Sequence, residues 1–84
     1  MKILKLYGTL RRAREAFKRD MAALPWVKAN TKGLVLEMEK FTIHYEPTTC
    51  RYKDRLSGLE FTSMWYDESA DAEACLWALT RVQA

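Results

Sequence analysis

The stretch Gly58-Leu-Glu-Phe-Thr-Ser-Met-Trp-Tyr-Asp-Glu-Ser69 decides the fold. In an extended chain successive side chains point to opposite faces, so Phe61 and Trp65 fall on one face and Met64 and Tyr66 on the other. A strand that is apolar on both faces is typical of the centre of a sheet covered on both sides. We therefore expect a central strand here, with its aromatic side chains in the core.

The first third of the chain predicts a strand followed by a helix. Residues 2–7 are rich in branched and aromatic side chains and stop at Gly8, as a strand would. Apolar residues then recur at helical spacing over residues 10–24, with Thr9 as a cap at the start and Pro25 ending the pattern. The expected buried stripe of this helix consists of Leu10, Ala13, Phe17, Met21 and Leu24.

The middle of the chain predicts one hairpin between two loops. Residues 34–38 and 41–45 alternate between apolar and polar side chains, which indicates two antiparallel strands that turn near residues 39–40. Residues 26–33 and 47–58 show no such alternation, and we expect both segments to be loops.

A second helix is predicted after the quoted stretch. Ser69 is a suitable cap residue, and Asp71 and Glu73 place negative charge near the positive end of the helix. The expected buried stripe consists of Ala72, Cys75, Leu76, Leu79 and Val82.

These elements predict one small α+β domain over residues 1–84. The expected order is β-α-β-β-β-α, with a mixed four-stranded sheet packed by two helices. A chain of 84 residues, of which 49% are hydrophobic, is long enough to bury one modest core without disulfides or metal.

Charge is distributed unevenly along the chain. Residues 1–33 hold nine Lys or Arg against two acids, a net charge of +7, whereas residues 60–84 hold five acids against Arg81 alone, a net charge of −4. The basic field of the protein therefore comes from one end of the sequence.

The sequence carries no recognisable targeting segment or cofactor motif. It has no signal-peptide pattern and no apolar run near the roughly 18 residues that a membrane span requires, so we expect a cytoplasmic protein without membrane contact. Cys50 and Cys75 are not spaced as metal ligands, and Cys75 is expected to be a buried free thiol. We expect neither a metal nor a cofactor.

Asp67 and Glu68 follow the quoted strand as the Walker B acids of nucleotide hydrolases follow theirs. There, the Asp holds Mg²⁺ and the Glu orients the attacking water, while the phosphates are held by a Gly-x-x-x-x-Gly-Lys-[Ser/Thr] loop whose backbone amides face them. None of the three glycines of this chain begins such a loop. We expect a vestigial Walker B element, in which the two acids end a strand and favour the start of a helix, and we expect the protein not to be an enzyme.

Two segments resemble the ATPase core of phage terminase large subunits. Asp54-Arg55-Leu56-Ser57-Gly58-Leu59-Glu60-Phe61 is similar to the Asp-Arg-x-Arg-Gly-Leu-x-Phe segment of that family, and Met64-Trp65-Tyr66-Asp67-Glu68 is similar to its apolar run ending in Asp-Glu. Residues 24–30 resemble the segment before the family's hairpin, and the order of elements over residues 1–79 resembles the part of the core after the Walker A helix.

The departures from that family limit what the resemblance implies. Ser57 stands where the family usually has Arg, and the Walker A strand and loop, the later motor motifs and the nuclease domain have no counterpart in this sequence. The resemblance implies an origin in a phage or mobile element and does not imply packaging activity.

The basic side of the first predicted helix is the second candidate site. Cations on one side of a helix neutralise phosphates and bind nucleic acid in a salt-dependent way, and Trp26 and Tyr52 are aromatic side chains on which bases stack. The same cations also fit an ordinary solvated helix face. The predicted nucleic-acid-binding residues are Arg11, Arg12, Arg14, Lys18, Arg19, Lys28 and Lys32.

Two functions stay open from the sequence. The first is an accessory protein that binds DNA or RNA through the basic helix. The second is a regulator or inhibitor of a host or phage enzyme that acts by surface or sheet-edge contacts. His44 has no identifiable nucleophile to activate and is expected at the surface, whereas Trp77 is expected in the core.

Overall fold

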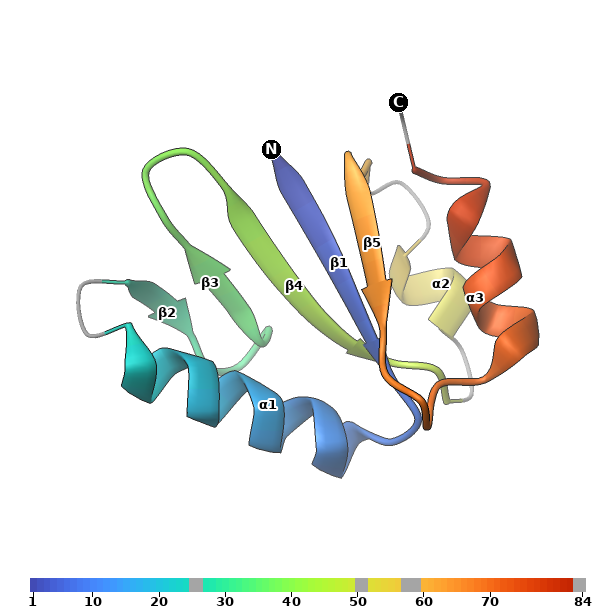
Figure 1. Ribbon diagram of the computed structural model, residues 1–84, viewed down its shortest axis with the longest axis horizontal. Coiled ribbons are helices and arrows are strands. Elements are labelled where there is room, and N and C mark those ends of the chain that lie inside the picture. Colours follow the sequence, from blue (N-terminus) through green and yellow to red (C-terminus); the bar gives the residue numbers. More distant parts are fainter. Residues whose placement is uncertain (25–26, 50–51, 57–59, 83–84) are drawn as a thin grey trace.

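The computed structural model describes residues 1–24, 27–49, 52–56 and 60–82 (Figure 1). The elements are β1 (Lys2–Tyr7), α1 (Leu10–Ala23), β2 (Lys28–Asn30), β3 (Val35–Glu37), β4 (Thr42–Pro47), α2 (Tyr52–Leu56), β5 (Ser63–Tyr66) and α3 (Ala72–Leu79). Both segments that were expected to be loops contain an additional element, the strand β2 and the short helix α2. The α+β class is confirmed.

The strands form one mixed sheet of five strands in the order β2-β3-β4-β1-β5. β1 pairs in parallel with β4 and β5, while β2, β3 and β4 are antiparallel neighbours, which confirms the predicted hairpin as β3 and β4. The prediction of four strands is wrong because Lys28–Asn30 pair with β3 although all three residues are exposed. A three-residue polar strand lacks the apolar alternation by which strands are recognised in a sequence.

The quoted stretch does not form the centre of the sheet. Among the described strands β5 pairs only with β1, so β5 lies at an edge and β1 lies between β4 and β5. Phe61 is buried as expected, but Trp65 and Tyr66 are 45% and 59% exposed. The two aromatic residues at the end of this strand are therefore only partly covered by the other described elements. Gly58 and Leu59 lie outside the described residues.

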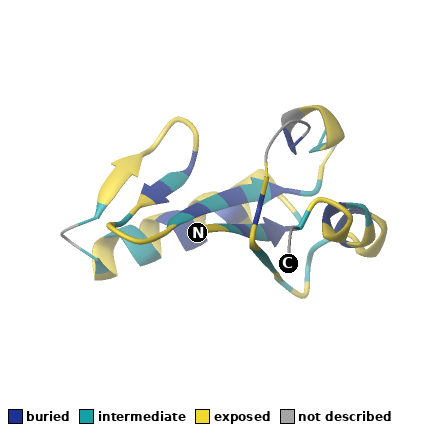
Figure 2. Ribbon diagram, turned by 90° about the horizontal axis from the view of Figure 1, so that it is seen from above, coloured by how far each residue is buried: buried dark blue, intermediate teal, exposed yellow. Residues whose placement is uncertain are grey.

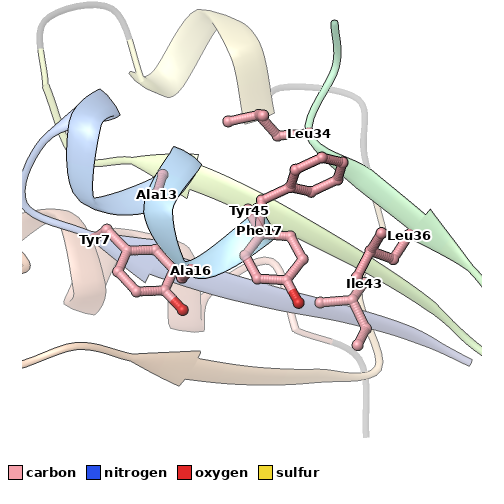
Figure 3. Packing of buried hydrophobic residues seen from close by; sticks show 8 residues of the cluster. All are labelled: Tyr7, Ala13, Ala16, Phe17, Leu34, Leu36, Ile43 and Tyr45. Carbon is pink, nitrogen blue, oxygen red and sulfur yellow. The ribbon is translucent and has the colours of Figure 1, made fainter. Parts of the chain in front are cut away.

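α1 packs on one face of the sheet (Figure 3). Thr9 caps the helix as predicted, and its hydroxyl accepts a first-turn backbone N–H at 3.1 Å. Ala13 and Phe17 are buried as predicted, whereas Leu10 is 42% exposed and Ala16 is buried in addition. The buried cluster on this face consists of Tyr7, Ala13, Ala16, Phe17, Leu34, Leu36, Ile43 and Tyr45.

A polar contact joins the far half of α1 to the sheet. The hydroxyl of Tyr45 donates a hydrogen bond of 2.5 Å to Asp20, and Nζ of Lys5 lies 3.6 Å from the same carboxylate. Burial raises the pKa of Asp20, but the hydrogen bond from Tyr45 and the charge of Lys5 outweigh burial and hold it below its ordinary value. The charged form of Asp20 therefore helps to hold the helix in place.

α2 and α3 lie on the opposite face of the sheet, where Leu4 and Leu6 of β1 point. Buried residues lie both on β1 and β4 and on the helices that cover them, whereas β2 is exposed along its length (Figure 2). The buried cluster on this second face consists of Leu4, Leu6, Leu56, Phe61, Cys75 and Ala78. The sheet therefore has a core on each face, and β1 contributes side chains to both.

The predicted cap and buried stripe of the last helix are wrong. Asp71 caps α3 in place of Ser69, and its carboxylate accepts the backbone N–H of Ala74 at 2.9 Å. Leu76 and Leu79 are 67% and 53% exposed. The side that faces the sheet carries small residues, namely Ala74, Cys75 and Ala78, and Cys75 is a buried free thiol as predicted.

Candidate functional site

The carboxyl ends of the three parallel strands meet at one edge of the sheet. From this edge the chain enters α1 on one face and α2 and α3 on the other, which is the arrangement at which open α/β sheets commonly bind ligands. Asp67 and Glu68 follow β5 at this edge, so the structure places the predicted vestigial Walker B acids where a ligand site is expected.

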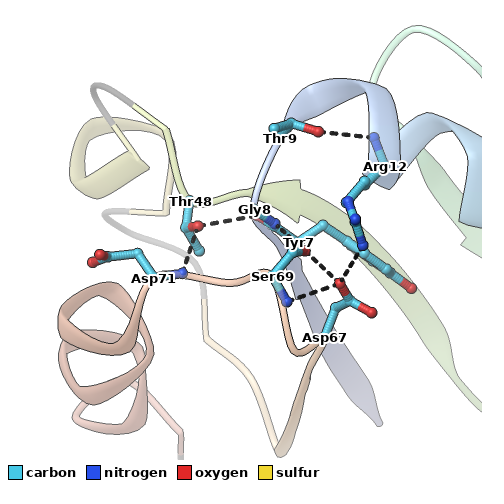
Figure 4. Close-up of polar contacts among 8 residues, drawn as sticks. All are labelled: Tyr7, Gly8, Thr9, Arg12, Thr48, Asp67, Ser69 and Asp71. Carbon is cyan, nitrogen blue, oxygen red and sulfur yellow. Dashed lines mark hydrogen bonds and ion pairs between the residues drawn. The ribbon is translucent and has the colours of Figure 1, made fainter.

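The three loops at this edge are joined by hydrogen bonds (Figure 4). The backbone N–H of Gly8 donates to Oγ of Ser69 at 3.0 Å. The hydroxyl of Thr48 donates to the carbonyl of Tyr7 at 3.0 Å and accepts the backbone N–H of Asp71 at 3.0 Å. We call Gly8, Thr48, Asp67, Ser69 and Asp71 the loop junction.

Gly8 allows the first loop to approach the third very closely. A Cβ atom at this position would lie 2.2 Å from the carbonyl oxygen of Ser69, a separation that no side chain tolerates. In a phosphate-binding loop the corresponding space is left open so that successive amides face the ligand. Here Ser69 occupies it.

The carboxylate of Asp67 is engaged within the loop junction. One of its oxygens accepts the backbone N–H of Ser69 at 3.1 Å and also accepts the Ser69 hydroxyl and, at 3.4 Å, the guanidinium of Arg12. The two bonds from Ser69, with a smaller contribution from Arg12, hold the pKa of Asp67 below its ordinary value. Glu68 is exposed in the turn that follows. This arrangement favours a structural role for Asp67.

All five predicted cations of α1 are exposed. Three of them lie near acids: Arg11 is 3.2 Å from Glu15, Arg12 is 3.4 Å from Asp67, and Arg19 is 3.4 Å from Asp20. Exposed ion pairs of this kind contribute about 0–1 kcal/mol each, so they hold these guanidinium groups only weakly. Arg14 and Lys18 form no ion pair with the part of the chain that the structure describes.

The cations of α1 divide between two sides of the helix. On the side towards β5, Arg12 and Arg19 line a hollow of about 710 Å³ together with the buried ring of Tyr7. Burial raises the pKa of the Tyr7 hydroxyl, which has no hydrogen-bond partner among the described residues. Arg11, Glu15 and Asp67 also line this hollow, so it combines three cations and two carboxylates with one buried polar group that has no described partner.

On its other side α1 faces the turn between β2 and β3. Arg14 of the helix and Lys32 of the turn line one hollow of about 330 Å³, in which Glu46 is the acidic residue. Lys28 is exposed on the adjacent strand β2. The structure therefore brings Arg14 and Lys32 together from different elements, whereas Lys28 lines a separate hollow with Glu37 and Glu39.

The aromatic residues predicted to stack with bases are not confirmed. Trp26 lies outside the described residues, and the ring of Tyr52 packs edge-on against Trp77, with 5.6 Å between centroids. Trp65 is the exposed aromatic side chain that the sequence analysis placed in the core. Its ring lies 5.5 Å from that of Tyr7 and 5.5 Å from Nζ of Lys5. The exposure of Trp65 follows from the position of β5 at the edge of the sheet, which the sequence pattern does not indicate.

No family model, curated protein or solved structure matches this chain. The similarity of residues 54–61 and 64–68 to terminase segments therefore stays a prediction.

The remaining candidate residues do not form a further site. The ring of His44 is half-buried and lies edge-on against Phe61 at 5.5 Å, and burial, with the charge of Lys2, lowers its pKa. Within residues 1–24, 27–49, 52–56 and 60–82, no three His, Cys, Asp or Glu side chains are placed to hold a metal ion. None of the helices described is long and apolar enough to cross a membrane.

Proposed function

We propose that this protein binds DNA or RNA without catalysing a reaction, through α1 and the adjoining turn between β2 and β3. The observation that carries the proposal is the position of Lys32 across a hollow from Arg14, which extends the basic surface beyond the helix. Because Arg14 and Lys18 are exposed one turn apart on α1 and Lys32 is exposed in the facing turn, a phosphate backbone can contact cations of both segments at once.

The ion pairs of α1 do not oppose this function. Arg11 and Arg19 are 88% and 72% exposed at the side chain, and their partners are the exposed Glu15 and the partly buried Asp20, which Tyr45 and Lys5 also contact. Such a pair is weak, so a phosphate replaces the carboxylate at low cost. Binding through these contacts depends on counterion release and is therefore expected to weaken steeply as salt rises.

The proposal includes neither catalysis nor a cofactor. Ser69 occupies the space next to Gly8, and the hydrogen bonds to Asp67 use the carboxylate that would face a Mg²⁺ ion. The resemblance to terminase segments adds to the proposal a role as an accessory protein of a phage or mobile element, in the host cytoplasm. Turnover of Mg²⁺-ATP that is lost in a Glu68→Gln variant would contradict the non-catalytic part.

The experiment is a binding titration with labelled single-stranded DNA, duplex DNA and RNA, followed by fluorescence anisotropy at increasing salt. We expect micromolar or weaker affinity, and a flatter salt dependence in the double variant Arg14→Gln/Lys18→Gln, by about one unit of slope for each lost phosphate contact. The double variant Lys40→Gln/Lys53→Gln removes the same charge from exposed sites outside α1 and is the matched control. Absence of binding at low salt, or an equal loss in the control, would contradict the proposal.

A second candidate function is a protein-binding regulator or inhibitor. It is favoured by exposed apolar side chains at Trp65, Tyr66, Leu76 and Leu79, all on β5 and α3. Affinity capture from host lysate after nuclease treatment separates the two functions. A regulator retains one stoichiometric protein, whereas a protein that binds only nucleic acid retains none.

A further inference from the structure

β5 presents a free edge at one side of the sheet. Within the described residues its pairing partner is β1, and the opposite edge is covered only before the strand begins, where Phe61 forms an isolated parallel bridge with Val82. No other strand of the described residues lies beside the open side of Ser63–Tyr66. Such an edge is a template for another strand.

An apolar groove runs beside this free edge, between β5 and α3. Its volume is about 530 Å³. Tyr66, Leu76 and Leu79 line it and are 59%, 67% and 53% exposed, so more than half of each side chain is in contact with water. The whole lining, which we call the β5–α3 groove, consists of Met64, Tyr66, Asp67, Glu68, Ala70, Ala72, Cys75, Leu76 and Leu79.

The apolar side chains gather here more than elsewhere on the described surface. Of the seven large hydrophobic residues that are exposed, three line the groove, namely Tyr66, Leu76 and Leu79, whereas Trp65 points to the other face of β5 and the remaining three lie on the N-terminus, α1 and the hairpin. An exposed apolar cluster of this kind marks an interaction surface. Its position next to an unpaired edge indicates a partner that uses both.

The charge around the groove is negative. Asp67 and Glu68 belong to its lining, and Glu73, exposed on α3, follows Ala72 of the lining in the chain. Arg81, the one base in residues 60–82, lies over the ring of Trp77 at 4.9 Å from the centroid. A basic partner is therefore complementary to this surface, whereas a second copy paired through its own β5 would bring the same carboxylates together.

We propose that β5 and α3 bind an extended, basic segment of a partner protein, which adds a sixth strand to the free edge of β5. Alternate side chains of that segment enter the β5–α3 groove, and its Lys or Arg side chains lie near Glu68 and Glu73. Main-chain hydrogen bonds to an edge strand supply affinity in this mode, and the groove supplies specificity. This inference deepens the second candidate function and is independent of nucleic-acid binding.

The test uses three synthetic peptides of equal length: an alternating Lys-Val peptide, an alternating Glu-Val peptide, and the Lys-Val peptide with alternate backbone nitrogens methylated. Binding is followed by NMR shifts and amide exchange of the labelled protein. We expect the Lys-Val peptide to slow amide exchange in β5 and to bind at least about tenfold more tightly than either of the others. Equal binding of the methylated peptide, or shifts confined to α1 or β2, would overturn the proposal.

Two pairs of variants separate the apolar and the charged parts of the surface. Leu76→Gln is expected to weaken Lys-Val binding about tenfold, because it removes a side chain from the groove, whereas Phe41→Gln, at an exposed site on the hairpin, is expected to leave it unchanged. Glu68→Lys, in the groove, should weaken binding of the Lys-Val peptide, whereas Glu39→Lys, outside the groove, should leave it unchanged. Equal effects within either pair would overturn the proposal.

Sedimentation and lysate capture distinguish this inference from the function on which it rests. A stable dimer of the unliganded protein that Leu76→Gln dissociates would overturn the proposal, because the groove would then hold a second copy. A captured partner that both Leu76→Gln and Glu68→Lys retain would overturn the groove proposal and leave the regulator function standing.

Discussion

The two edges of the sheet differ in almost every property that governs contact with other molecules. β2 is short, all three of its residues are exposed, and it carries Lys28 and is followed by Lys32. β5 has two large aromatic side chains exposed, and carboxylates lie at both of its ends. An edge strand that carries Lys resists pairing with other strands, whereas β5, which is only one residue longer than β2, carries no charged residue. The comparison indicates that β2 ends the sheet and β5 is open to a partner.

The helices on the two faces of the sheet also differ in which side chains they expose to water. α1 turns a buried apolar stripe towards the sheet and cations towards water, as an amphipathic helix normally does. α3 turns small residues towards the sheet and leaves Leu76 and Leu79 exposed. Folding of the single chain therefore buries the apolar stripe of α1 but leaves Leu76 and Leu79 of α3 exposed to water.

β1 is the element that both halves share. Tyr7 joins the cluster under α1, whereas Leu4 and Leu6 join the cluster under α2 and α3. Because one strand supplies both cores, we expect the two halves to unfold together even though their surfaces differ.

The largest expected effects test this coupling. Phe17→Ala in the α1 core and Phe61→Ala in the α3 core should each lower the free energy of unfolding by about 3–5 kcal/mol, because each removes a side chain that is almost fully buried. Urea unfolding should give coincident transitions by far-UV circular dichroism and by tryptophan fluorescence. If these variants do not fold, Phe17→Leu and Phe61→Leu allow the same comparison with a smaller loss in the free energy of unfolding. Separate transitions would show that the halves are independent.

The next effect concerns the loop junction, which joins the halves at the carboxyl edge. Gly8→Ala should lower the free energy of unfolding by about 1–3 kcal/mol, because the new Cβ meets the backbone of Ser69 at 2.2 Å. Gly33→Ala is the matched control, since its Cβ would meet the side chain of Asn30 at 3.3 Å, and a side chain moves aside more easily than backbone does. Thermal melts of the two variants measure the difference, and similar melting temperatures would contradict the close approach at Gly8.

The smallest expected effect is the change in the free energy of unfolding as the pH is lowered. The pKa of His44 in the folded protein lies below its ordinary value of 6.5, so the unfolded chain binds the proton more readily and stability falls as the pH drops below about 6.5. Asp20 and Asp67 also have lowered pKa values, but their contribution is lost only as the pH falls below 3.8. His44→Gln should therefore flatten stability between about pH 5 and pH 7. An unchanged slope in that variant would contradict the assignment to His44.

Part of the candidate site was predictable from the sequence. The exposure of all five predicted cations of α1 follows from its 3.6-residue periodicity, which is a local property, but they divide between two sides of the helix and do not form the single face that was expected. The proximity of Arg14 to Lys32, by contrast, depends on β2 pairing with β3, and a strand of three polar residues leaves no periodic signal in a sequence. The β5–α3 groove was not predictable, because Tyr66, Leu76 and Leu79 are residue types that usually lie in the core.

The sequence by itself determined the α+β class, α1 with its cap, the hairpin and the separation of positive and negative charge, because each depends on neighbouring residues or on composition. Tertiary structure alone decided that β1 and not the quoted stretch lies inside the sheet, that Ser69 closes the space beside Gly8, and that α3 faces the core with its small residues. The physical reason is that burial depends on which elements pack together. The spacing of apolar residues along a sequence is the same whether other parts of the chain cover them or leave them exposed.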